Sequence, residues 1–338
     1  PLSTGTAGPG YSSVALTADQ KTITSRTNSN RVSARAIAGH KWNIDIGYNP
    51  MTQEQFMPIY NFLLHRNGPL NPFYVSLPQY RIPQNSTFNT YVSDSTNPLC
   101  LYPTAAVASG STSMLLRGRL HGKDQSIVSL GTIGTYDITS GNQNKTYTNI
   151  AGTGGSGTGA TFTVVTPSSG LLGVQPTVTV YNPGYGYNES GTDTLQINGA
   201  LVGGSGNISV PIQSVDTGSS TSYYNQYHYQ GLGTPTAGDL FTISDSDASN
   251  HTKAYMVTRV ETNVDYLNGG TQPTVNQVLI HFTPGLSKDV HAGDSGTGRR
   301  LNFYNPLIRV VLPKAITKYS LDMNNLYKYS LKVEESES

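Results

Sequence analysis

Short segments of strand-forming residues, each bounded by turn residues, limit the fold of this chain more than any other feature. One such segment spans 113–118, and three more span 237–243, 254–260 and 278–284. Each has the length and the residue types of a β-strand. A long stretch rich in Gly, Ser and Thr separates the first segment from the other three. The pattern therefore predicts one small β-domain whose strands lie on both sides of an insertion.

The separating stretch carries a strand pattern of its own. Apolar and polar residues alternate in four places, with glycine-rich turns between them, which is typical of a small all-β module. We predict that this inserted module spans 133–232 and divides a β-barrel domain made of 101–132 and 233–300. The alternating apolar residues of the module are Phe162, Val164, Val178, Val180, Leu195, Ile197, Ile208, Val210 and Ile212.

The first hundred residues predict a β framework with one helix. Trp42, Ile44 and Ile46 alternate with polar residues, as expected for a strand with one buried face. Residues 301–338 contain regular strands as well, and we expect these C-terminal strands to return to the framework formed by 1–100.

A helix is predicted at about 52–66. Thr52 and Gln55 have the spacing of a capping box, and an apolar stripe with helical spacing follows. Pro58 predicts a kink or a later helix start, since proline removes a hydrogen-bond donor. Gly68 is suited to end the helix in a left-handed conformation.

The predicted fold class is mainly β: a β-sandwich or barrel framework with one short helix, a divided small β-barrel domain and an inserted all-β module. Residues 79–112 show few periodic signals between Pro, Asn and Ser. We interpret them as a long surface arm or a loop between domains.

Composition narrows the classes of function. The 338 residues are 36% hydrophobic and 12% charged, with a formal net charge of +1, which argues against a disordered chain. No basic stripe marks a dedicated nucleic-acid binder, although passive contact with DNA would not need one. The 22 tyrosines suit half-buried sheets and wet interfaces.

The N-terminus has no signal-peptide pattern and no apolar stretch reaches the length of a membrane span. We therefore expect assembly in a cytoplasm.

The sequence contains no recognisable set of catalytic residues. Residues 152–157 match G-x-G-x-x-G, but a strand pattern follows in place of the helix that dinucleotide binding requires. Residues 245–249 resemble part of a calcium loop but lack its Gly and its final Glu, so we interpret them as a polar hairpin turn. We predict no enzymatic activity, no catalytic residues, no cofactor and no metal.

One aromatic segment is a candidate for partner contact. Tyr223, Tyr224, Tyr227 and Tyr229 lie close together near the end of the inserted stretch. The segment is either a contact loop or a simple return strand, and the sequence does not choose between the two.

Several longer segments form a recognisable set. In the framework these are KWNIDI at 41–46, PMTQEQFMPIYNFL at 50–63 and NPFYVSLP at 71–78. In the divided domain they are GSTSMLLRG at 110–118, AGDLFTI at 237–243, AYMV at 254–257 and IHFTPGL at 280–286, and in the module they are GTGATFTV at 157–164 and NPGYGY at 182–187. The framework and divided-domain segments resemble distal-tail-type baseplate components of tailed bacteriophages, and the module segments are similar to a β-module seen across phage structural proteins.

The resemblance implies a structural protein of the virion tail or baseplate. Copies of the chain would form a ring between the tail tube and the receptor-binding or hub parts, with passive contact to DNA in the tail lumen and no membrane partner. The alternative is a carbohydrate-binding, receptor-binding tail-fibre module, which the tyrosine segment and the β-rich insertion suggest. A glycan hydrolase is a third hypothesis, but no carboxylate pair stands out for it.

Overall fold

The computed structural model describes residues 10–337 except 37–38, 121–124, 189–192, 216–226, 245–250, 268–270, 293–299 and 315–317. The chain divides into two compact units, and each is described by itself. Unit 1 comprises 1–79, 250–254 and 305–338, and unit 2 comprises 80–249 and 255–304. The fold is mainly β, as predicted, with several sheets and few helices.

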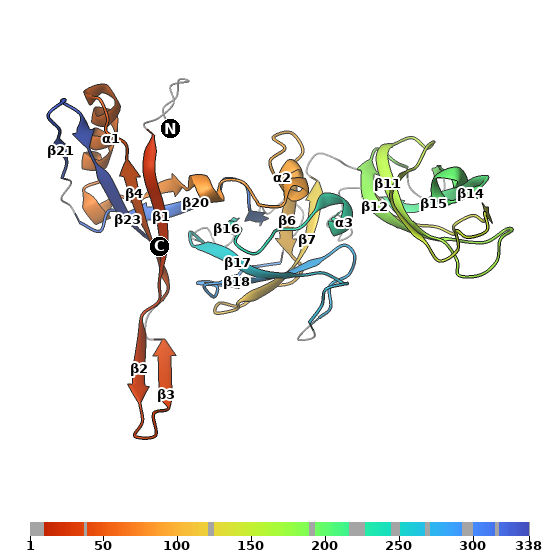
Figure 1. The fold of residues 1–338 in the computed structure, drawn as a ribbon, viewed down its shortest axis with the longest axis horizontal. Coiled ribbons are helices and arrows are strands. Elements are labelled where there is room, and N and C mark those ends of the chain that lie inside the picture. Colours follow the sequence, from red (N-terminus) through yellow and green to blue (C-terminus); the bar gives the residue numbers. More distant parts are fainter. Residues whose placement is uncertain are drawn as a thin grey trace. The chain divides into compact units, whose positions relative to one another are not determined.

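Unit 1 is built on a five-stranded antiparallel sheet that joins the two ends of the chain (Figure 1). Pairing between strands of this sheet brings its core residues together. Ile44 lies opposite Val333, Ile46 lies opposite Leu331, and all four side chains are buried. In sheet order the strands are β1 (Tyr11–Asp19), β4 (Lys41–Tyr48), β23 (Ser330–Glu335), β20 (Leu307–Val311) and β5 (Phe73–Ser76).

The helix α1 (Gln53–His65) matches the predicted helix and contributes Phe56 and Leu63 to the core of unit 1. The side-chain oxygen of Gln55 accepts a hydrogen bond from the backbone N–H of Thr52 at 3.2 Å, as in a capping box. Pro58 lies inside the helix, so the predicted late start is wrong. After the helix, Asn67 adopts the left-handed conformation before Gly68 does, with φ of 52° and 66°.

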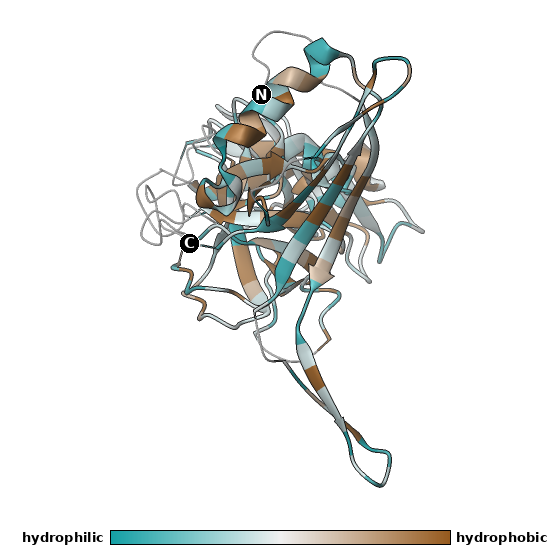
Figure 2. Cartoon of the chain, turned by 90° about the vertical axis from the view of Figure 1, so that its left-hand side faces the viewer, coloured by the Kyte–Doolittle hydropathy of each residue, from teal (hydrophilic) through white to brown (hydrophobic). Residues whose placement is uncertain are grey.

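A hairpin extends the pair β1–β4 beyond the sheet (Figures 1 and 2). It consists of β2 (Thr22–Arg26) and β3 (Val32–Ala36), which pair in antiparallel register. We call residues 20–36 the β2–β3 arm. A second, shorter hairpin joins β21 (Ser320–Leu321) to β22 (Tyr327–Lys328).

Unit 2 contains a closed β-barrel whose strands come from both sides of the inserted stretch. Buried side chains such as Leu116, Phe241, Tyr255 and Ile280 fill its core. In barrel order the strands are β16 (Leu240–Ser244), β17 (Ala254–Glu261), β18 (Val278–Thr283), β7 (Ser113–Leu120), β6 (Leu99–Pro103) and β19 (Arg300–Asn302).

The inserted module has sheets and a core separate from those of the barrel, and all nine predicted alternating residues are buried there. Its three sheets are β10 (Thr146–Ala151), β11 (Thr158–Val165) and β12 (Thr177–Tyr185); β13 (Thr194–Asn198), β15 (Asn207–Val215) and β8 (Ile127–Leu130); and β14 (Gly204–Ser205) with β9 (Asp137–Ile138).

The predicted bounds of the module, 133–232, need correction. Ile127 at the start of β8 belongs to the module's core. Tyr227 and Leu232 belong instead to the core of the barrel. The module therefore spans about 127–215, because β8 completes one of its sheets by pairing with β15.

Residues 79–112 are not the long surface arm or the loop between domains that the sequence predicted. They contain α2 (Ser86–Val92) and the barrel strand β6, so residues 80–100 belong to unit 2 and not to the N-terminal framework. Asn85 caps α2 by accepting a hydrogen bond from the backbone of Phe88 at 3.2 Å. Short helices elsewhere are α3 (Tyr229–Leu232), η1 (Gly68–Leu70), η2 (Pro78–Tyr80) and η3 (Gly199–Val202).

Candidate functional site

The structure describes two of the four tyrosines in the predicted contact segment, and these two differ in burial. Tyr227 is fully buried in the barrel core, and its hydroxyl donates a hydrogen bond to the carbonyl oxygen of Gly233 at 2.7 Å. Tyr229 is partly buried at the start of α3, where its hydroxyl bonds to Asn263. Tyr223 and Tyr224 lie outside the described residues. Tyr227 is therefore a core residue, and its assignment to partner contact is corrected.

Of the two ligand-binding motifs, the structure describes only the one at 152–157, and it forms no phosphate site. Residues 152–157 connect β10 to β11 within an antiparallel pair, so no helix N-terminus follows the glycines to hold a phosphate. Residues 245–249 lie outside the described part of the chain. Within the described ranges, no group of three or more His, Cys, Asp or Glu side chains is placed to hold a metal ion.

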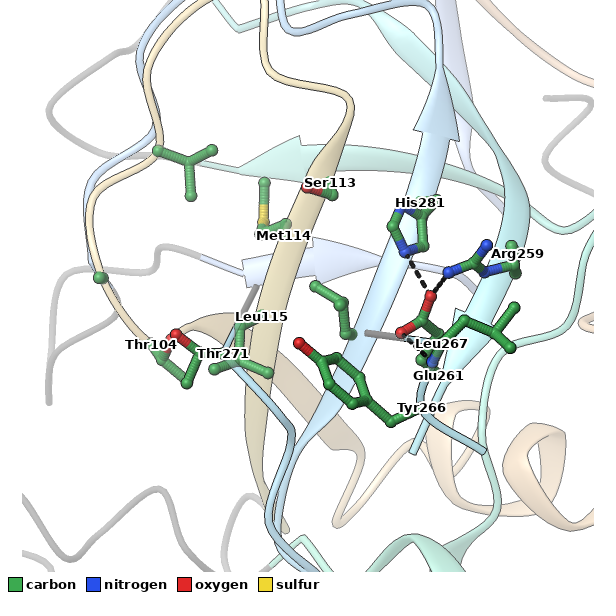
Figure 3. Close-up of a pocket in the computed structure, with 13 residues that line it drawn as sticks. Thr104, Ser113, Met114, Leu115, Arg259, Glu261, Tyr266, Leu267, Thr271 and His281 are labelled. Atoms are coloured by element: carbon green, nitrogen blue, oxygen red, sulfur yellow. Dashed lines mark hydrogen bonds and ion pairs between the residues drawn. The ribbon is translucent and has the colours of Figure 1, made fainter. Parts of the chain in front are cut away.

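A pocket of about 330 Å³ lies on the barrel over strands β17, β18 and β7 (Figure 3). Arg259, His281 and Ser113 share one side of the sheet because Arg259 pairs with His281, and His281 pairs in turn with Ser113. Glu261 and Leu279 form the next such pair along the strands. Met114, which also lines the pocket, belongs to the barrel core. The volume is in the range of small-molecule sites, which is about 300–1,000 Å³.

Glu261 is the most deeply placed charge of this pocket. It is 2% exposed, although Arg259 and His281 beside it are partly open to solvent. Its Oε1 atom contacts both the Arg259 guanidinium and, at 3.1 Å, Nε2 of His281. The backbone N–H of Leu267 donates to Oε2 at 3.4 Å, near the limit of a hydrogen bond.

The pocket as a whole carries no net charge. The Arg259 guanidinium balances the Glu261 carboxylate. Burial, followed by the nearby charge of Arg259, lowers the pKa of His281, which favours the neutral form of the ring. Figure 3 shows these three side chains grouped together with Tyr266, while Met114 and Leu115 come from β7.

A second cluster of charged side chains lies in unit 1, where it is buried and has a structural role. Lys253 is 3% exposed and pairs with Glu335 at 3.0 Å. The Glu335 carboxylate also accepts hydrogen bonds from the backbones of Trp42 and Ala254. Burial raises the pKa of Glu335, while these donors oppose the rise. Because protein groups already occupy the carboxylate, we assign the pair no binding role.

The β2–β3 arm is the most exposed surface of unit 1. Residues 21–35 are all exposed, including Ile23 at 56% and Val32 at 52%. Ile23 lies opposite Arg35, and Val32 lies opposite Arg26. Because paired residues project from the same side of a sheet, each face of the arm presents one aliphatic side chain beside one arginine.

Comparisons with known proteins do not identify a family: no family model and no curated protein matches the chain. In the part of the chain that the structure describes, no helix is both long and apolar enough to cross a membrane. The proposals below therefore rest on the geometry of the two units and on the sequence motifs.

Proposed function

We propose that this chain is a structural subunit of a bacteriophage virion tail or baseplate. Copies form a ring between the tail tube and the receptor-binding or hub parts. The observation that carries this proposal is the β2–β3 arm, because an ordered hairpin with no core of its own needs a partner surface. The motifs at 41–46, 50–63 and 71–78 support the same class of protein.

The energetics of the arm favour a contact with another molecule. A two-stranded hairpin is at best marginally stable in water, because ordering its backbone costs about 1–2 kcal/mol per residue. The arm buries none of residues 21–35 within its own chain. Burial of Ile23 and Val32 against a neighbour would offset part of that cost.

The sheet of unit 1 offers surfaces that can receive such a contact. Strands β1 and β5 lie at its two edges, where no further strand of the described residues pairs with their backbones. On β5, Tyr74 is 59% exposed, and Leu307 of the adjacent strand is 44% exposed. A head-to-tail contact repeated between identical chains closes into a ring when its rotation permits.

In this proposal the other partners are the tail tube and further baseplate proteins. DNA in the tail lumen would make only passive contact. The protein would be located in the virion after assembly in the cytoplasm of the host bacterium, with no catalytic role.

Electron microscopy and light scattering of the purified full chain test the proposal. We expect rings or defined oligomers from the wild-type chain, alone or after mixing with the tail-tube protein of the same virion. The double variant Ile23→Asp/Val32→Asp should remain monomeric, because it places charge on both faces of the arm.

A matched control separates an arm effect from a general effect of added charge. Leu172 is 80% exposed in the inserted module, so Leu172→Asp should assemble like the wild type. All three proteins should have the same melting temperature. A wild-type chain that stays monomeric at every concentration and beside its tail-tube partner would rule out the proposal.

A further inference from the structure

The pocket on the barrel contains a buried carboxylate, that of Glu261. Glu261 is only 2% exposed although it lies beside two partly open side chains, because Tyr266 and Leu267 border the pocket. A buried ion pair contributes little net stability compared with apolar residues of similar size. Ionisable groups kept in a pocket in this way are a mark of binding sites.

We propose that this pocket binds a single uncharged sugar ring of a glycan. Arg259 and Glu261 form an ion pair that balances their charges, and burial favours the neutral form of the His281 ring. An anion would lie close to the Glu261 carboxylate and a cation close to the Arg259 guanidinium, so each meets a repulsive charge. A neutral ligand rich in hydroxyl groups avoids both.

The hydrogen-bonding groups of the pocket match hydroxyl groups. A hydroxyl both donates and accepts, and an ionised carboxylate has about four acceptor positions. Among the described residues, Arg259 and His281 contact Oε1 of Glu261, whereas Oε2 accepts the long bond from the Leu267 backbone. Oε2 can therefore accept from a sugar hydroxyl, and the Arg259 guanidinium has N–H groups beyond the one that contacts Glu261.

The apolar part of the pocket matches the other surface of a sugar. A pyranose ring presents C–H groups on its faces and hydroxyl groups around its edge. Leu115 and Leu279 offer aliphatic surface, and Tyr266 offers an aromatic ring, within the same space as the charged group (Figure 3). This combination of apolar lining and few polar groups is typical of small-ligand pockets.

Two neighbouring substitutions provide a test that leaves the ion pair intact. Ala105 lines the pocket and is exposed, whereas Ala106 is exposed but does not line it. Ala105→Trp should fill the pocket, and Ala106→Trp adds the same side chain outside it. Because both positions are exposed, both variants should fold like the wild type, which circular dichroism can verify.

Ligand-observed NMR of the full chain gives the readout. The probes are glucose, galactose, mannose, rhamnose and N-acetylglucosamine, with glucuronic acid and glucosamine as charged analogues. We expect saturable binding of at least one uncharged sugar, with a Kd of about 1 mM for a single ring. Ala105→Trp should weaken it at least about tenfold, while Ala106→Trp leaves it unchanged.

Three results would overturn the inference: no saturable binding of any uncharged sugar, equal binding by the two tryptophan variants, or tighter binding of a charged analogue. Glu261→Gln adds a second check if it folds, since it should weaken the same sugar. The inference goes beyond the proposed structural role, and assembly is measured separately. A chain that forms rings but binds no sugar would contradict the inference alone.

Discussion

At the scale of single residues, the buried Lys253–Glu335 ion pair of unit 1 depends on several further polar partners. The Lys253 ammonium also donates to the carbonyl oxygen of His40 at 2.6 Å, and it contacts Glu337. The Nε1–H of Trp42 donates to the carbonyl oxygen of Ala254 at 2.9 Å. Burial of these charges is tolerated because backbone and side-chain partners surround them.

Breaking this pair should destabilise unit 1 strongly. Lys253→Met leaves the Glu335 carboxylate buried without its cation, and we expect the free energy of unfolding to fall by about 3–5 kcal/mol. Lys332→Met, which removes an exposed contact to Asp45 at 3.6 Å, should cost less than about 1 kcal/mol. Chemical denaturation of both variants measures the difference, and equal losses would contradict this assignment.

His228 should make unit 2 sensitive to acid. The side chain is 4% exposed, and neither ring nitrogen has a hydrogen-bond partner among the residues that the structure describes. Burial lowers its pKa to about 4 from an ordinary 6.5. A lowered pKa means that the folded state disfavours the charged ring. The stability linked to the neutral ring is therefore present above pH 6.5 and is lost as pH falls toward 4.

The expected loss at pH 4 is about 3 kcal/mol relative to pH 7. Denaturant unfolding of the chain at a series of pH values measures it. His228→Phe should remove this part of the pH dependence because phenylalanine does not titrate. His65→Phe, at the exposed end of α1, should keep the wild-type profile. A wild-type profile in His228→Phe would show that another group causes the acid sensitivity.

At the scale of elements, the β2–β3 arm combines exposed aliphatic side chains with an excess of positive charge. Lys21, Arg26, Arg31 and Arg35 lie on it, and no Asp or Glu occurs between residues 20 and 44. A partner surface that receives the arm should therefore carry complementary negative charge.

We predict that assembly through the arm weakens with salt. Raising the ionic strength from about 0.1 M to about 1 M shortens the Debye length from about 10 Å to about 3 Å, which screens exposed charges. Light scattering should show dissociation over this range for the wild-type chain. Arg26→Gln/Arg35→Gln should assemble more weakly at low salt and respond less to added salt. Assembly that strengthens with salt would instead indicate a purely apolar contact.

At the scale of the whole molecule, unit 2 contains two separate cores within one continuous chain. The barrel core and the module core have no buried residue in common. The module also contacts the rest of unit 2, for example through the hydrogen bond that Asn182 donates to the Tyr91 hydroxyl at 3.1 Å. A module with its own core can fold alone.

We therefore predict that a fragment of residues 125–216 folds independently. It should give a dispersed NMR spectrum and a cooperative thermal transition. A fragment cut at 133–232 should fold poorly, because it loses β8 with Ile127 and retains Tyr227 and Leu232 without the barrel that buries them. Equal folding of the two fragments would contradict the corrected bounds.

Local patterns in the sequence predicted the elements whose signals are local. The alternation at 42–48 predicted β4, and the capping residues Thr52 and Gln55 predicted α1. The helix α2 was missed because it is only seven residues long and has just two buried apolar positions, Phe88 and Val92. Too few apolar residues repeat there to reveal a helical period.

The sequence by itself determined that the chain is mainly β, with an inserted module, because side-chain alternation is a property of neighbouring residues. Only the tertiary structure placed Tyr227 in the barrel core, left the β2–β3 arm uncovered and brought Glu261 to His281. The pocket residues come from strands whose register is set by pairing between distant segments. The alternation within each strand sets which face is buried, whereas the choice of neighbouring strands depends on pairing between segments far apart in the chain.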